Sequence, residues 1–204
     1  AWVNPKLFIT QAEIGAPPDA FQKNGQTWGV LPLDPVELRE QHYAPLIELL
    51  RAAMRFSGAL RLDHVMSLFR LWWVPLGQPA AEGAYVQYPA DELLAILALE
   101  SHRHRAMIVG EDLGTVPAGV RERLETERIL GCRVALFERD SLGNWTPPEH
   151  YRSLSVASFG THDLPTLAGF WLGRDVEVRA RLGLFRTPEE AEGAPIARVR
   201  ERLR

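Results

Sequence analysis

Three acidic side chains stand where short apolar runs end, and together they have the chemistry to cleave a glycosidic bond. They are Asp63, Glu111 and Asp163. Such cleavage needs one carboxylate that attacks or stabilises the anomeric carbon and one carboxylic acid that protonates the leaving oxygen. A third acidic group can bind sugar hydroxyls. Each acid considered alone also has a structural interpretation, because Asp often caps a helix and Glu111-Asp112 is a common turn sequence.

The runs before these acids have the length of β-strands and alternate with helical stretches. We expect strands in four segments, 59–64, 106–112, 132–138 and 155–163. Helices are predicted between them, notably over 89–104 and 117–127. A strand followed by a helix, repeated along the chain, predicts parallel β/α units.

The first of these strands separates charged from apolar side chains. Period-two alternation places Arg61 and Asp63 on one face, with Leu60 and Leu62 on the other. Charged groups at the carboxyl ends of parallel strands are the usual site of catalysis in a (β/α)8 TIM barrel. The expected fold class is therefore α/β, and residues 1–204 are expected to form a partial (β/α)8 barrel domain with about half of its eight strands.

Other parts of the chain extend this organisation. Residues 1–45 lack regular periodicity and carry clustered Pro and Gly, so we expect a long loop region that binds substrate. An amphipathic helix is predicted over 45–56, and charged helices over 175–182 and 187–204. The chain opens on Ala1 without an initiator methionine and stops inside its last predicted helix, which suggests a fragment of a longer protein.

The composition argues against several classes of partner. The formal net charge of the 204 residues is -3, and no block of Lys and Arg is present, so we expect neither nucleic acid nor a membrane surface as a partner. No apolar run approaches the roughly 20 residues of a membrane span, and no signal peptide opens the chain. Cys132 is the single cysteine, which excludes an internal disulfide and fits a cytoplasmic location.

We expect neither a metal site nor a cofactor. His102 and His104 stand two positions apart on a predicted helix, so their rings point away from each other. Proton transfer and charge stabilisation by carboxylates need no cofactor. The adjacent Trp72 and Trp73 are expected to pack in the core or beneath a loop.

Five motifs resemble those of amylomaltases, the 4-α-glucanotransferases or disproportionating enzymes of the α-amylase clan. Three look like the family's catalytic signatures: RLDH at 61–64, GEDLG at 110–114 and THDLPT at 161–166. Two upstream motifs, GAPPDAF at 15–21 and GQTWG at 25–29, are similar to loop motifs that distinguish amylomaltases within the clan. The resemblance implies a retaining enzyme that transfers α-1,4-glucan segments between maltooligosaccharides.

The resemblance also implies a role for each matched residue. Asp63 matches the nucleophile, which forms a covalent glucosyl-enzyme intermediate, and Glu111 matches the general acid/base. Asp163 matches a third carboxylate that stabilises the transition state and binds hydroxyls of the reacting sugar. Residues that match site-ordering or sugar-binding positions are Arg61, His64, His162, Asp19, Gln26 and Trp28. A retaining mechanism predicts a separation of about 5 to 5.5 Å between the Asp63 and Glu111 carboxyl groups.

The upstream motifs offer aromatic and polar contacts for sugars. Trp28 and Phe21 present flat faces on which pyranose rings can stack, and Gln26 can bind hydroxyls. Core packing is the alternative for both rings; we favour sugar contact for Trp28 and leave both options open for Phe21.

The chain departs from the family pattern in sequence and in length. Val65-Met66-Ser67 stands where many members have Phe-Arg-Gly, which affects packing and leaves the catalytic groups in place. The family's enzyme is more than twice as long as this chain. Two other hypotheses therefore stay open: an α-glucan hydrolase of the same clan, and a non-catalytic glucan-binding or structural fragment with an incomplete barrel.

Overall fold

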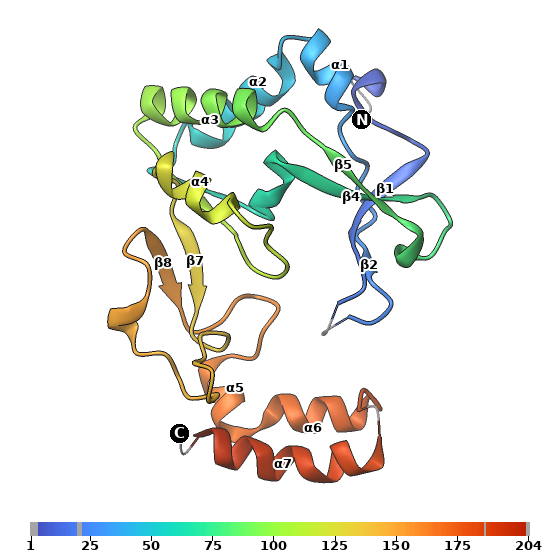
Figure 1. The fold of residues 1–204 in the computed structure, drawn as a ribbon, viewed down its shortest axis with the longest axis vertical. Helices are drawn as coiled ribbons and strands as arrows, with labels where there is room; N and C mark the ends of the chain where they lie inside the picture. The colour runs from blue at the N-terminus through green and yellow to red at the C-terminus, as the bar shows by residue number, and fades with distance from the viewer. Residues whose placement is uncertain (1–3, 20–21, 186, 203–204) are drawn as a thin grey trace. The chain divides into compact units, whose positions relative to one another are not determined.

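The chain folds into two compact units. The computed structural model describes residues 4–19, 22–185 and 187–202, and these divide into Ala1–Gly131 and Cys132–Arg204. Both units contain strands and helices (Figure 1). The fold class is therefore α/β, as the sequence predicts.

Two parallel strands in the first unit lead to the acidic residues. β3 (Ala59–Leu62) pairs with β6 (Met107–Gly110) in a register that places Leu62 opposite Gly110. Leu130 continues the pairing, because its carbonyl accepts a hydrogen bond from the Gly110 amide at 2.7 Å. Both strands fall inside predicted segments, and each ends before the acidic residue that follows it.

Three helices pack their apolar faces against this strand pair. They are α2 (Ala44–Met54), α3 (Ala90–His104) and α4 (Val120–Thr126); α3 and α4 lie within predicted helices, and α2 overlaps the helix predicted over 45–56. α2 and α3 lie side by side (Figure 1). Leu94 and Leu97 of α3, Met54 of α2, Leu124 of α4 and Ile108 of β6 belong to one buried cluster. Burying each such side chain contributes roughly 1.5 to 3 kcal/mol to stability.

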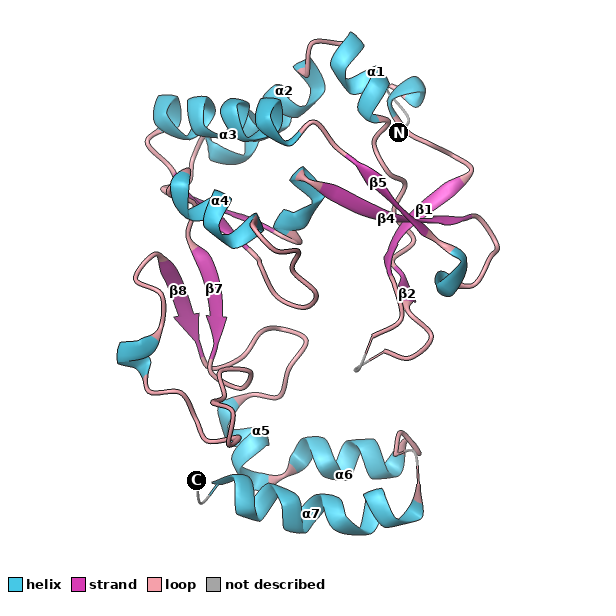
Figure 2. Ribbon diagram, in the orientation of Figure 1, coloured by secondary structure: helices cyan, strands magenta, loops and turns pink. Residues whose placement is uncertain are grey.

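A four-stranded antiparallel sheet in the same unit contradicts the expectation of one long loop over residues 1–45. Figure 2 shows its strands, whose order is β2-β1-β4-β5. Their bounds are β1 (Ala12–Ala16), β2 (Gln26–Thr27), β4 (Arg70–Pro75) and β5 (Ala84–Gln87). The first 45 residues also include η1 (Pro5–Leu7) and α1 (Pro35–Glu40). The sheet forms because β1 finds its partner in β4, with Ala12 opposite Pro75, so a local window of sequence does not reveal it.

The adjacent tryptophans of β4 serve opposite faces of this sheet. Trp73 packs against a second apolar cluster that includes Leu71 and Leu93. Trp72 meets Tyr85 of β5 edge to face, with ring centroids 4.8 Å apart. Its indole N–H donates to the Ala80 carbonyl in η3 (Ala80–Glu82) at 2.9 Å. These contacts agree with packing in the core and beneath a loop.

A buried carboxylate joins α2 to α3. Glu100 of α3 is 1% exposed and accepts hydrogen bonds from Arg51 of α2 at 2.9 Å and from Arg103 at 2.8 Å. The hydrogen bonds from Arg51, helped by those from Arg103, lower the pKa of Glu100 from 4.5 to about 2, although burial opposes the shift.

Glu100→Gln is expected to lower the free energy of unfolding by about 1 to 3 kcal/mol at neutral pH, because both arginines lose their anionic partner. The folded-state pKa lies below the unfolded-state value. The contribution of Glu100 is therefore fully present above pH 4.5 and is lost as pH falls toward 2. The free energies of unfolding of the native protein and the variant, measured by urea denaturation, should become equal as pH falls through this range.

Glu92→Gln is the matched control for this effect. The Glu92 carboxylate is 45% exposed and pairs with an exposed Arg39, so its loss should change stability by less than about 1 kcal/mol. A stability difference for Glu100→Gln that stays constant down to the lowest pH at which both proteins remain folded would contradict the ion-pair explanation.

The second unit contains the other two predicted strands and the charged helices. β7 (Gly131–Val134), which begins at the last residue of the first unit, pairs with β8 (Ser155–Ser158), and both arrows run the same way in Figure 2. The helical segments are η4 (Pro148–His150), α5 (Leu167–Leu172), α6 (Arg174–Arg181) and α7 (Pro188–Arg202). Arg198 of α7 holds both carboxylate oxygens of Asp175 in α6, at 2.8 and 2.6 Å.

The strands do not close into a barrel within residues 4–19, 22–185 and 187–202. They form the antiparallel sheet and two parallel pairs. The partial barrel expected over residues 1–204 is therefore a prediction that this part of the chain leaves open. No helix among the same residues is long and apolar enough to cross a membrane.

Candidate active site

The alternation of β3 presents its charged residues away from the core. Leu60 and Leu62 pack against the buried cluster of the first unit, whereas Arg61 and Asp63 face outward. The Arg61 guanidinium donates to Asp63 Oδ1 at 2.5 Å, and the two side chains are 42% and 74% exposed. Asp63 therefore carries a cationic partner at the carboxyl end of the strand.

The parallel register brings the ends of β3 and β6 together. Because Leu62 lies opposite Gly110, Asp63 and Glu111 are the next residues on neighbouring strands. The two Glu111 oxygens accept hydrogen bonds from backbone amides, Oε2 from His64 at 2.9 Å and Oε1 from Leu113 at 2.7 Å. The Glu111 side chain thus spans from its own strand to the residue beside Asp63.

His64 makes the turn that allows this contact. Its φ of 45° is in the left-handed region, which residues other than glycine adopt infrequently and which is enriched at functional sites. The next residue begins η2 (Val65–Leu68), and the Val65 amide donates to the Glu111 carbonyl at 2.9 Å. The turn therefore fastens the chain after β3 to the chain after β6.

The GQTWG motif at 25–29 contacts the residues after β3 through Trp28. Its indole ring meets the His64 ring edge to face, with centroids 5.2 Å apart, and its N–H donates to Gln26 Oε1 at 3.2 Å. Gly15 permits the close hairpin behind this contact, because a Cβ there would lie 2.0 Å from the Gln26 carbonyl oxygen. The structure therefore brings Gln26, Trp28, His64, Asp63 and Glu111 into one site.

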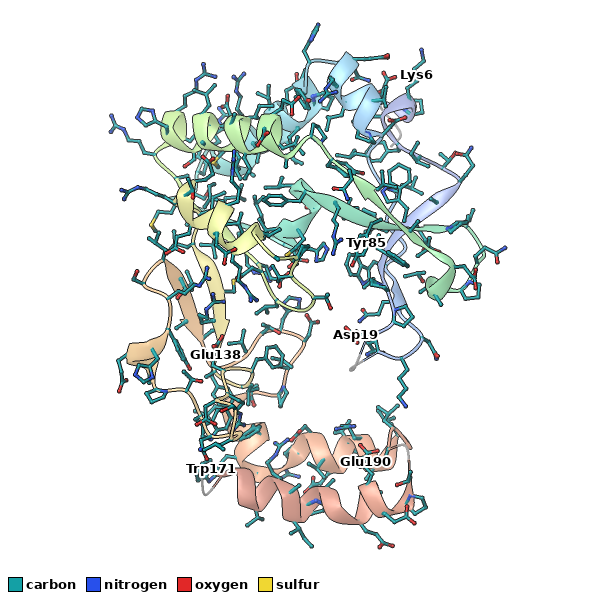
Figure 3. All side chains as sticks on the ribbon, in the orientation of Figure 1. Lys6, Asp19, Tyr85, Glu138, Trp171 and Glu190 are labelled. Carbon is teal, nitrogen blue, oxygen red and sulfur yellow. The ribbon has the colours of Figure 1, made fainter. Side chains whose placement is uncertain are left out.

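Two further predicted residues of the upstream loop have different outcomes. Asp19 lies in the loop between β1 and β2 (Figure 3), where its carboxylate accepts the Gln22 amide at 2.6 Å and shapes the loop backbone. Its role in binding sugar stays a prediction. Phe21 lies outside the residues that the structure describes.

Asp163 and His162 belong to the second unit. They lie in the loop after β8, with His162 Nε2 3.3 Å from Asp163 Oδ2 and both side chains more than 70% exposed. The Thr161 hydroxyl accepts the Asp163 amide at 3.2 Å. The roles of both residues stay predictions from the motif.

His64 is partly buried, and its ring contacts Trp28. Burial lowers the pKa of His64 below 6.5, while the nearby Glu111 and Asp63 carboxylates oppose the shift. Burial therefore favours the neutral ring, in which one nitrogen donates and the other accepts a hydrogen bond.

Trp28→Ala is expected to raise the pKa of His64 toward 6.5, because water then reaches the ring. The measurement is an NMR titration of the His64 ring protons, assigned with His64→Gln. Phe56→Ala is the aromatic control, since Phe56 is 90% exposed and its ring faces Arg55. A titration midpoint that Trp28→Ala leaves unchanged would show that Trp28 does not shield the imidazole.

Sequence reasoning missed the environment of Asp112. This carboxylate is 1% exposed, and Arg121 of α4 donates to it at 2.9 Å. The two residues are nine positions apart across a loop, so no helical or strand spacing signals the pair.

No metal centre accompanies these groups in the described part of the chain. It contains no group of three or more His, Cys, Asp and Glu side chains arranged to hold a metal ion. His104 instead bonds through Nδ1 to the Glu100 carbonyl oxygen at 2.9 Å.

Acidic residues at the carboxyl ends of adjacent parallel strands, with an indole ring beside them, define a candidate carbohydrate-active α/β enzyme. The chain belongs to the 4-alpha-glucanotransferase family, whose family model matches residues 1–199. This match covers all five motifs and both units.

Relatives of known name agree with this membership. A 4-alpha-glucanotransferase of Haemophilus influenzae is 47% identical over 184 residues, covering 90% of this chain and 26% of that protein. One of Mycobacterium bovis is 44% identical over 196 residues, covering 94% of this chain and 27% of that protein. The chain thus spans about a quarter of the length of these relatives.

Solved structures agree with the fold. The crystal structure of amylomaltase from Corynebacterium glutamicum matches 95% of this chain with a TM-score of 0.89 and 38% identity, over 28% of its own length. Amylomaltase from Streptococcus agalactiae, in complex with acarbose, matches 92% with a TM-score of 0.73 over 40% of its own length. At 23% identity the second match supports the fold alone.

Proposed function

We propose that this chain supplies the nucleophile and the acid/base of a retaining 4-α-glucanotransferase. The observation that carries the proposal is the bond from the His64 amide to Glu111, which joins the residue beside Asp63 to a second carboxylate on the paired strand. Family membership over residues 1–199 supports the same reaction. Maltooligosaccharides are the proposed donors and acceptors.

The reaction proceeds by two displacements. Asp63 attacks the anomeric carbon of the donor and forms an ester, while protonated Glu111 gives its proton to the departing glycosidic oxygen. The acceptor's 4-hydroxyl then loses its proton to Glu111 and attacks the same carbon, which releases Asp63. One α-1,4 bond is broken and one is made, so bond type and anomeric configuration are conserved.

The surrounding residues have supporting roles in this proposal. Arg61 orders Asp63 through their ion pair, and His64 hydrogen-bonds the reacting sugar. Asp163 and His162 bind hydroxyls of that sugar, and Asp163 stabilises the transition state. Residues assigned to flanking sugar subsites are Asp19, Gln26 and Trp28. Trp28 is 39% exposed, which leaves part of its ring free for a pyranose.

We further propose that β3, β6, β7 and β8 are four strands of a (β/α)8 barrel. Catalytic residues of such a barrel follow the carboxyl ends of several strands, as Asp63, Glu111 and Asp163 do in this chain. The similarity to amylomaltase from Corynebacterium glutamicum supports this assignment. Because the chain spans about a quarter of the length of its relatives, we propose that catalysis requires a longer chain, the full-length protein. A cytoplasmic location stays a prediction.

Incubation of the full-length protein with maltotriose, followed by thin-layer chromatography, tests the function. Glucose together with a ladder of longer maltodextrins is the expected result. Glucose and maltose without longer products would identify the hydrolase of the same clan instead. Maltotriose binding detected by calorimetry without any turnover would favour a glucan-binding protein. The isolated 204 residues, assayed in parallel, report whether the remainder is needed.

A further inference from the structure

One backbone peptide group donates a hydrogen bond to the Glu111 carboxylate. The amide of Leu113 donates to Glu111 Oε1 at 2.7 Å, and this N–H belongs to the peptide that joins Asp112 to Leu113. The carbonyl of the same peptide, Asp112 O, points the opposite way and accepts a hydrogen bond from Arg121 Nη2 at 2.9 Å. A single planar unit therefore connects the Arg121 guanidinium to the proposed acid/base.

Arg121 holds Asp112 at two points. Besides the carbonyl, its Nε donates to the Asp112 carboxylate at 2.9 Å. The fork of the guanidinium thereby sets both the position of the side chain and the rotation of the peptide plane. A lysine ammonium is a point charge and lacks this two-point geometry.

The side chain of Asp112 is closely packed. Its side chain is 1% exposed, and a Cβ on Gly131 would lie 3.1 Å from Asp112 Oδ1. The carboxylate therefore rests against the Gly131 backbone, which leaves Asp112 little room to move. Arg121, at the start of α4, contacts Asp112 from the protein surface, and its side chain is 38% exposed.

We infer that Arg121 and Asp112 are positioning residues that orient the Asp112–Leu113 peptide so that its N–H holds Glu111 in place for proton transfer. The inference rests on the proposed role of Glu111. A hydrogen bond to a peptide carbonyl polarises the amide and strengthens the bond that its N–H donates. Without Arg121, the peptide is free to rotate and Glu111 loses one of its two backbone anchors.

The test compares Arg121→Lys and Arg121→Ala with Arg123→Ala in the full-length protein. Arg123 lies on the same helix and pairs with Asp91 and Glu127 on the surface. With maltotriose, both Arg121 variants are expected to lose about 10- to 100-fold in kcat while KM stays within about twofold, because the acid/base is misplaced and sugar contacts persist. Guanidinium ion should restore part of the activity of Arg121→Ala. Arg123→Ala should retain the native kcat.

A second measurement tests the hydrogen bond of the Leu113 amide without relying on turnover. Hydrogen exchange of the Leu113 amide should be faster in both Arg121 variants than in the native protein and unchanged in Arg123→Ala. Native kcat and native exchange in Arg121→Lys would overturn the inference. A lower kcat with a raised KM, a lowered melting temperature and no rescue by guanidinium ion would also overturn the inference. That combination indicates a purely structural role for Arg121.

These readouts distinguish failure of this inference from failure of the proposed function. Absence of glucan transfer by the native full-length protein would remove the proposed function, and the positioning role with it. The exchange rates of Leu113 would then still report whether Arg121 orients the peptide. Transfer by the native protein with unaffected Arg121 variants would leave the proposed function standing and remove only the positioning role.

Discussion

Asp63→Asn is expected to reduce glucan transfer from maltotriose by at least about 10⁴-fold in the full-length protein, because the amide is a poor nucleophile and no ester forms with the donor. The Arg61 guanidinium, now 2.5 Å from Asp63 Oδ1, would also lose its anionic partner. KM for maltotriose should change little, since the sugar contacts of the other residues persist. Product formation over time, quantified by chromatography, gives both constants.

Asp91→Asn is the matched control for this change. Asp91 is a surface aspartate whose side chain is 85% exposed and whose partner is Arg123. Its variant should transfer glucan at the native rate. Retention of more than about one hundredth of the native rate by Asp63→Asn would be too much for a protein that has lost its nucleophile, and the assignment of Asp63 would have to be withdrawn.

Glu111→Gln is expected to lower maltotriose transfer by about 10²- to 10⁴-fold, because the leaving oxygen receives no proton. An α-maltotriosyl fluoride donor should bypass this defect in the first step, since fluoride departs as an anion and needs no acid. Attack by Asp63 then breaks the C1–F bond and forms the ester. The glutamine cannot accept the proton of the incoming hydroxyl, so the ester should accumulate.

Peptide mass spectrometry after exposure to the fluoride locates this ester. The maltotriosyl group is expected on the peptide that contains Asp63 in Glu111→Gln, and to be absent in the double variant with Asp63→Asn. Glu40→Gln, which changes an exposed glutamate of α1, should behave as the native protein. A labelled peptide that contains Asp163 in place of Asp63 would reassign the nucleophile.

Local pattern was sufficient for the elements that carry their own periodicity. β3 is recognisable because Leu60 and Leu62 alternate with Arg61 and Asp63, and the structure partly buries the leucines and exposes the charged pair. α3 is recognisable because its leucines recur on one face. The predicted strands were too long at their carboxyl ends; after β3, His64 turns into the left-handed region.

Long-range pairing was beyond local pattern. β1 and β4 are joined only when Ala12 meets Pro75, and the Pro and Gly residues around β1 resemble loop composition. The same limitation hid the partners of Glu100 and Asp112. The Arg51 partner of Glu100 comes from another helix and the Arg121 partner of Asp112 from across a loop, so both contacts exist only after the helices have packed.

The sequence by itself determined which chemical groups this protein has and, through five motifs, which family it belongs to. Motif residues reveal identity because the reaction tolerates few alternatives at the reacting atoms. The tertiary structure decided how those groups are held. The parallel register sets Glu111 against the His64 amide, the hairpin of β1 and β2 brings Trp28 to His64, and the packing of α4 places Arg121 on the Asp112–Leu113 peptide. Each of these contacts joins residues that no helical or strand spacing places together, so only folding of the chain creates them.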